Sequence, residues 1–93
     1  MGLRFAEGTR AYLRTLAPGP KKAIRHALQR IAEDPRHHEL DLKQLQKVGD
    51  HRYYRARVQN HYRIIYSPAA DHTYIWRIMH RSEGYDWLDR LDP

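Results

Sequence analysis

The spacing of the apolar residues changes once along the chain, at Asp34-Pro35. Before this point, apolar side chains recur at helical spacing from Ala23 to Ile31, with lysine, arginine and glutamine between them, which predicts an amphipathic helix. The helix ends at Asp34-Pro35, because the residue before a proline resists helical angles. Further along, apolar and polar residues alternate, as they do in strands with one buried face. Segregated helices and strands of this kind favour the α+β class.

Two further segments precede this helix. Leu3-Arg4-Phe5 is compatible with a short first strand, and residues 7–16 have the apolar spacing of a short amphipathic helix. Pro18-Gly19-Pro20 interrupts the helical pattern, since proline is tolerated only where the next helix opens. The sequence therefore predicts a helical hairpin after the first strand.

The second half of the chain predicts three closely spaced strands. From Tyr53 to Val58 the residues alternate, with Tyr54, Ala56 and Val58 on one side and Tyr53, Arg55 and Arg57 on the other. Short polar turns separate this run from the runs Tyr62–Tyr66 and Thr73–Met79, which favours an antiparallel meander. The segment around Leu40, Leu42 and Leu45 fits a strand or a loop. Residues 83–91 are expected to form a short closing helix.

The 93 residues are enough for one domain spanning residues 1–93, because two halves would each bury too little surface. The chain has no cysteine, which excludes disulfides, a thiol nucleophile and a cysteine zinc site. Adjacent His37 and His38 are poorly placed as joint ligands, so we expect neither metal nor cofactor. No stretch has the apolar run of a signal peptide or a membrane span, and we expect a cytoplasmic protein.

The charge balance favours an anionic partner. Seventeen lysines and arginines against eleven acids give a formal net charge of +6, which suits nucleic acid, an acidic protein or a membrane surface. Arginines concentrate in the predicted sheet, at Arg52, Arg55, Arg57, Arg63, Arg77 and Arg81. Guanidinium groups hold phosphate in bidentate fashion, which favours RNA. The alternative is that these arginines pair with Asp41, Asp50 or Glu83, or remain solvated.

A group of chemically active residues follows the last predicted strand, in the segment His80-Arg81-Ser82-Glu83-Gly84-Tyr85. Metal-free RNA cleavage needs a base for the ribose 2′-hydroxyl, cations for the phosphate and an acid for the leaving 5′-oxygen. Arginine suits only the cationic role, so His80 or Tyr85 would move protons, unless orientation dominates. On a regular strand, however, His80 and Arg81 would point to opposite faces.

These motifs resemble those of a known family. The run Tyr54-Arg55-Ala56-Arg57-Val58, followed by Tyr62-Arg63-Ile64-Ile65-Tyr66, resembles the central hairpin of RelE/ParE-superfamily toxins of type II toxin–antitoxin systems. His80-Arg81 and Tyr85 resemble the terminal HR-x-x-x-Y signature of that family. The leucine of the K-L-x-G lead-in has a counterpart in Leu45. The chain departs from some members in having arginine for lysine at 55 and 57, and in a shorter interval between Arg81 and Tyr85.

The resemblance implies a RelE-like fold and a toxin held inactive by a cognate antitoxin protein. In the RelE branch it implies a metal-independent endoribonuclease that cleaves messenger RNA in the ribosomal A site and inhibits translation. By the same resemblance, Arg55 and Arg57 bind RNA and Arg63 stabilises the transition state. His80, Arg81 and Tyr85 complete the catalytic set.

Two other functions fit the same sequence. The ParE branch shares the fold and poisons DNA gyrase by protein contact, without needing His80 or Tyr85. A member that has lost toxicity would serve only to bind its antitoxin or an operator. The presence of both residues favours the nuclease.

Overall fold

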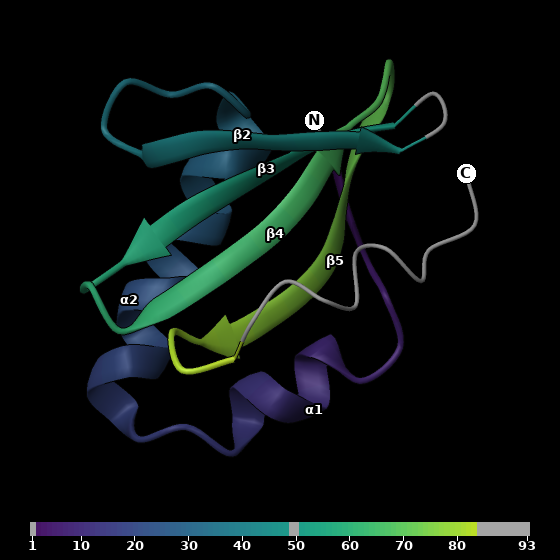
Figure 1. Cartoon of the computed structure of the whole chain (residues 1–93). Coiled ribbons are helices and arrows are strands. Elements are labelled where there is room, and N and C mark those ends of the chain that lie inside the picture. The colour runs from purple at the N-terminus through teal and green to yellow at the C-terminus, as the bar shows by residue number, and fades with distance from the viewer. Residues whose placement is uncertain (1, 49–50, 84–93) are drawn as a thin grey trace.

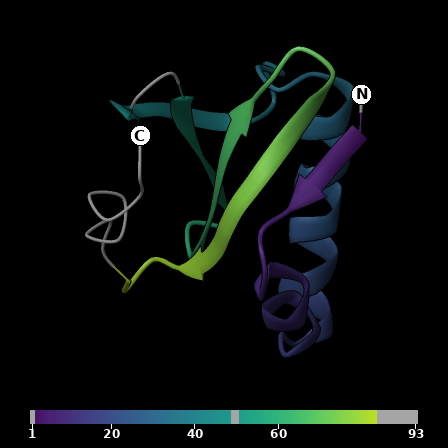
Figure 2. The same cartoon turned by 90° about the vertical axis from the view of Figure 1, so that its right-hand side faces the viewer.

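The computed structural model describes residues 2–48 and 51–83 (Figure 1). Its five strands form a single sheet in the order β1-β5-β4-β3-β2. Both helices lie on the same face of this sheet, as the turned view shows (Figure 2). The elements, in chain order, are β1 (Gly2–Phe5), α1 (Thr9–Arg14), α2 (Pro18–Glu33), β2 (Asp41–Val48), β3 (His51–Val58), β4 (Tyr62–Pro68) and β5 (His72–His80).

The α+β class and the helical hairpin are confirmed, but the sheet is mixed rather than antiparallel. Strand β1 runs parallel to β5, with Gly2 opposite His72 and Phe5 opposite Ile75, whereas all other neighbouring strands are antiparallel. The expected first strand, Leu3-Arg4-Phe5, carries no signal for strand direction in its sequence. Its orientation follows from the crossover through both helices, which lets the first and last strands meet side by side.

Two segments remain to be compared with the sequence predictions: the stretch around Leu40 to Leu45 and the expected closing helix. The stretch that fitted a strand or a loop is the edge strand β2, whose pairing with β3 shifts between Gln44 and Lys47. An irregular edge of this kind weakens the alternation on which sequence prediction depends. The expected closing helix at residues 83–91 falls, except for Glu83, outside the described residues.

The main core lies between the helices and the sheet. As predicted, Tyr54, Ala56 and Val58 face it and are buried. They pack with Leu13, Ile24, Leu28, Ile31, Ile64, Tyr66, Ile75 and Ile78. The opposite face carries a smaller apolar cluster of Tyr53, Ile65 and Met79, with Leu45 and Trp76 packed against it. This second cluster means that the arginine-bearing face is partly apolar.

Two tyrosines tie the segment after α2 to the sheet. The hydroxyl of Tyr66 donates to the carbonyl oxygen of Pro35 over 2.5 Å, and a terminal nitrogen of Arg36 donates to the hydroxyl of Tyr54 over 3.1 Å. The rings of Tyr54 and Tyr66 stack with their centroids 5.8 Å apart. The end of α2 is thereby held over β3 and β4.

Tyr66 should make the protein sensitive to alkali. Burial, and to a lesser degree the nearby Tyr54, raises the pKa of Tyr66 far above its ordinary value of 10.0. The folded state therefore retains a proton that the unfolded state loses, so stability is complete below pH 10 and falls above it. We expect a loss of up to about 1.4 kcal/mol per pH unit above about pH 10 from this group.

Urea denaturation between about pH 8 and pH 11 tests this expectation. The Tyr66→Phe variant should be less stable at neutral pH, because the Pro35 carbonyl loses its donor, yet its stability should fall less steeply with pH. Equal pH slopes for the two proteins would contradict the assignment. Some slope should remain in the variant, because burial also raises the pKa of Tyr12 and of Tyr53.

Candidate functional site

The sheet face opposite the helices, which we term the open face, collects most of the sheet arginines. Strand register places its side chains in rows that run across the strands from β2 to β5. The first row is Asp41, Arg57, Arg63 and Met79; the second is Lys43, Arg55, Ile65 and Arg77. A third group consists of Leu45, Tyr53 and Trp76. Two rows are thus cationic, and the third is aromatic and apolar.

The first row sets two arginines directly opposite each other. Arg57 is the register partner of Arg63, an arrangement of like charges that is destabilising on its own. Nε of Arg57 donates to Oδ2 of Asp41 over 2.6 Å, while a terminal nitrogen of Arg63 donates to the carbonyl oxygen of Tyr62 over 3.1 Å. Within the part of the chain that the structure describes, no carboxylate forms an ion pair with Arg63.

The pKa of the Asp41 carboxyl shows that several arginines lie close to it. The hydrogen bond from Arg57 lowers the pKa of the Asp41 carboxyl below its ordinary value of 3.8, and the charges of Arg57, Arg55 and Arg63 lower it further. Three guanidinium groups therefore act on one exposed carboxylate. The same place would attract a phosphate group, because its anionic oxygens accept hydrogen bonds from guanidinium groups as a carboxylate does.

In the second row one arginine has a carboxylate partner and the other has none among the described residues. Arg77 pairs with Oε1 of Glu83 over 3.1 Å. Arg55 stands between Lys43 and Ile65 and, among residues 2–48 and 51–83, has no carboxylate partner. The alternative of internal pairing therefore holds for Arg57 with Asp41 and for Arg77 with Glu83. Asp50, the third acid of that alternative, lies outside the described residues, and among those residues no carboxylate pairs with Arg55 or Arg63.

The structure separates His80 from the arginine rows. Its ring meets Tyr62 edge-on at 5.4 Å, and Tyr62 packs against the core beneath the helices, so His80 lies on the helix side of the sheet. Nδ1 of His80 accepts the backbone N–H of Ser82 over 3.2 Å and lies 3.0 Å from the Ser82 hydroxyl. With Nδ1 as the acceptor, a neutral ring carries its proton on Nε2.

Arg81 follows directly after the last residue of β5 and begins a turn. Its backbone N–H donates to the carbonyl oxygen of His61 over 2.7 Å, and its side chain is exposed. Strand alternation extended from Met79 by two residues would place Arg81 on the open face, beside the row of Arg57 and Arg63. Tyr85, the remaining expected catalytic residue, lies outside the described residues.

Lys43 and Trp76 had not been assigned to the site from sequence. The indole N–H of Trp76 donates to the hydroxyl of Ser67 over 2.8 Å, and its ring lies 4.5 Å from that of Tyr74. Lys43 could have been found if residues 41–45 had been assigned to a strand, because period two links it to Asp41. Trp76 could not, because the pairing of β4 with β5 shifts there.

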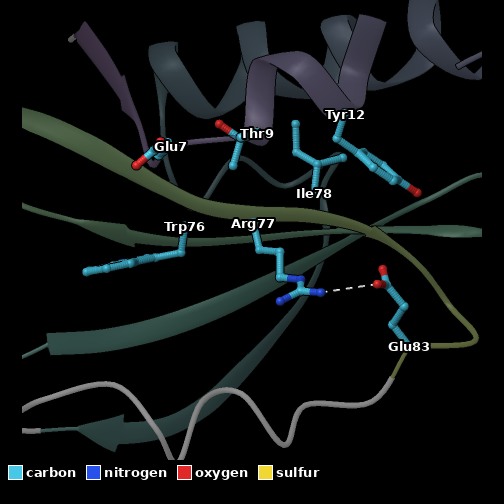
Figure 3. Close-up of a pocket in the computed structure, with 8 residues that line it drawn as sticks. Glu7, Thr9, Tyr12, Trp76, Arg77, Ile78 and Glu83 are labelled. Atoms are coloured by element: carbon cyan, nitrogen blue, oxygen red, sulfur yellow. Dashed lines mark hydrogen bonds and ion pairs between the residues drawn. The ribbon is translucent and has the colours of Figure 1, made fainter. Parts of the chain in front are cut away.

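A pocket of about 270 Å³ adjoins this region between the start of α1 and β5 (Figure 3). The ion pair of Arg77 and Glu83 lies on one side of it, and Thr9 and Tyr12 line the other (Figure 3). Across the described ranges, no three histidine, aspartate or glutamate residues are grouped so that they could hold a metal ion. Within those ranges no helix is both long and apolar enough to cross a membrane.

The family model of the ParE toxin of type II toxin-antitoxin system, parDE, matches residues 5–85. The chain belongs to this toxin family. It is therefore a type II toxin of the RelE/ParE superfamily, as its motifs indicated. No curated protein sequence matches it significantly.

Solved toxin structures share the fold. A chain of the archaeal RelE–RelB complex from Pyrococcus horikoshii OT3 aligns with a TM-score of 0.74 and 21% identity, covering 89% of this chain and 97% of that one. The RelB–RelE antitoxin–toxin complex from Methanococcus jannaschii gives 0.68 and 26%, with 90% and 96% covered. The isolated E. coli RelE toxin gives 0.69 and 16%, with 96% and 93% covered. The expected RelE-like fold is thus confirmed.

Proposed function

We propose that this toxin is a metal-independent endoribonuclease that cleaves messenger RNA, with the ribosome presenting the substrate. The observation that carries the proposal is the open face itself. It sets Arg57 directly opposite Arg63, and it leaves Arg55 and Arg63 without a carboxylate partner among the described residues. A like-charge cluster of this kind is costly unless an anion neutralises it. Phosphodiester groups match the fork of the guanidinium.

In the proposed reaction, the ribose 2′-oxygen attacks the adjacent phosphorus and the bond to the 5′-oxygen breaks. The products are a 2′,3′-cyclic phosphate and a 5′-hydroxyl end. Arg55 and Arg57 hold the RNA, while Arg63 and Arg81 neutralise the charge that builds on the phosphate. The proton of the 2′-hydroxyl passes to water, and Tyr85 protonates the leaving oxygen.

His80 takes a supporting part in this scheme. Its ring lies on the helix side, and its Nδ1 is engaged by Ser82, so we assign it no proton transfer. Its backbone N–H donates to Oε2 of Glu83 over 3.2 Å, and Glu83 also pairs with Arg77. We propose that these contacts fix the turn that carries Arg81.

We also propose that a cognate antitoxin binds this toxin. The support is the type II family together with the two archaeal neighbours, which were solved with RelB. An acidic or amphipathic antitoxin segment would neutralise the open face.

Mapping of messenger RNA 5′ ends after induction tests the nuclease. The wild-type chain should create new ends inside translated codons, and Arg81→Ala should lose most of them while remaining folded by circular dichroism. Arg25→Ala removes an exposed arginine from α2, on the other side of the sheet, and should cut like wild type. Growth arrest without new ends would reject the nuclease.

The family model supports a second candidate, since its description names the ParE toxin. A ParE-like toxin would inhibit DNA gyrase through protein contact. Induction would then produce a DNA-damage response and filamentous cells, whereas the nuclease stops translation first.

A further inference from the structure

We propose that Asp41 is a positioning residue, which holds Arg57 so that Arg57 and Arg63 together grip one phosphate group. The inference rests on the open face as the RNA-binding site of the proposed function, but not on cleavage. Asp41 is one of three acids in the sequence that could have neutralised the sheet arginines. Neutralising the charge of Arg57 would need only a nearby carboxylate, whereas Asp41 accepts a short hydrogen bond from one particular nitrogen, Nε.

The contact engages one side of the guanidinium. Asp41 accepts from Nε of Arg57 at 2.6 Å, whereas a terminal nitrogen of Arg57 has only a long contact of 3.5 Å to the side-chain oxygen of Asn60. The carboxylate therefore fixes the plane of the group and leaves the fork of its two terminal nitrogens for another acceptor. A free arginine side chain would lose more rotamer freedom on binding a phosphate.

The register of the strands places Arg63 next to Arg57, so that both can contact the same phosphate. Asp41, Arg57 and Arg63 are successive partners across β2, β3 and β4. Directly opposite side chains in such pairs lie about 5 Å apart at Cβ, a span that one phosphate can bridge between two guanidinium groups. Among the described residues Arg63 has no carboxylate partner, and a phosphate from outside would supply an acceptor in that place.

Two variants of equal charge separate positioning from electrostatics. Asp41→Asn keeps an oxygen that accepts from Nε, and Asp41→Ala removes it, while both lose the same negative charge. The probe is a single-stranded RNA oligonucleotide methylated on every 2′-oxygen, which cannot be cleaved. We expect Asp41→Asn to bind it at least as tightly as wild type, and Asp41→Ala to bind about fivefold to tenfold more weakly than Asp41→Asn.

The chain offers a matched control pair. Arg30 and Glu39 form an ion pair whose side chains are 39% and 47% exposed, close to the 40% and 50% of Arg57 and Asp41. The Glu39→Gln and Glu39→Ala variants should bind the probe equally. In an Arg57→Ala background, the difference between Asp41→Asn and Asp41→Ala should vanish. Because Asp41 is exposed, both variants should fold, and circular dichroism would verify it.

A nuclear magnetic resonance signal gives a readout independent of affinity. The Nε–H resonance of Arg57 should be resolved in wild type and in Asp41→Asn, should weaken in Asp41→Ala, and should shift when the probe is added. Equal affinities for the two Asp41 variants, or tighter binding by Asp41→Ala, would overturn the positioning role. If the probe distinguishes the variants and no messenger RNA is cut by wild type, the nuclease fails and the phosphate grip stands.

Discussion

Arg63→Ala should slow messenger RNA cleavage by about 10²- to 10³-fold, the usual effect of removing one donor from a developing anionic centre. Arg63 lies directly across from Arg57 and has no carboxylate partner among the described residues, and in the proposed function its positive charge acts on the RNA phosphate. Its removal should not lower stability. The loss of a like charge opposite Arg57 relieves repulsion and offsets the lost bond to the Tyr62 carbonyl.

Slower cleavage together with unchanged stability distinguishes an arginine that acts on the substrate from one that only supports the fold. Cleavage rates and thermal denaturation should be measured together on Arg63→Ala, Arg63→Lys and the control Arg25→Ala. Arg63→Lys should recover part of the rate, because lysine keeps the charge but not the planar fork. A variant Arg63→Ala that is folded and cleaves like wild type would remove Arg63 from the site.

The largest effect on stability is expected from Ile64→Ala, at about 2–5 kcal/mol. Ile64 is fully buried and lies between Ala56 and Ile78 in the central strand, against the helices. Truncation removes apolar contacts and leaves a cavity that the flanking strands cannot fill. A domain of this size has a total stability of only about 5–15 kcal/mol, so the variant should unfold at markedly lower urea concentration.

The matched control is Ile64→Val, which removes one methylene group and should cost about 0.5–1.5 kcal/mol. Urea midpoints for the three proteins give the comparison. Equal midpoints for Ile64→Ala and wild type would mean that the helices do not pack on β4 as the structure has them. Loss of toxicity in Ile64→Ala should be repaired by lower temperature, in contrast to Arg63→Ala.

Much of the site could be predicted because alternation along β3 is regular. Placing Tyr54, Ala56 and Val58 in the core puts Arg55 and Arg57 on the other face, and the register of the hairpin adds Arg63. The face on which His80 lies was harder to predict, because the active-site hypothesis needed it beside Arg81. Alternation already indicated that the two side chains point to opposite faces of the sheet. The contact of His80 with Tyr62 shows that alternation holds from Arg77 to the end of β5, beyond the register shift at Trp76.

By itself the sequence determined the local structure: the two helices, the end of α2 before Pro35, the two faces of β3 and the strand state of β4. These follow from periodicity and from proline sterics, which act within a few residues. Only the tertiary structure decided the direction of β1, the strand state of residues 41–48 and the pairing of Asp41 with Arg57. Each of these depends on residues distant in the chain. Their energy comes from packing and register across strands, which no local pattern encodes.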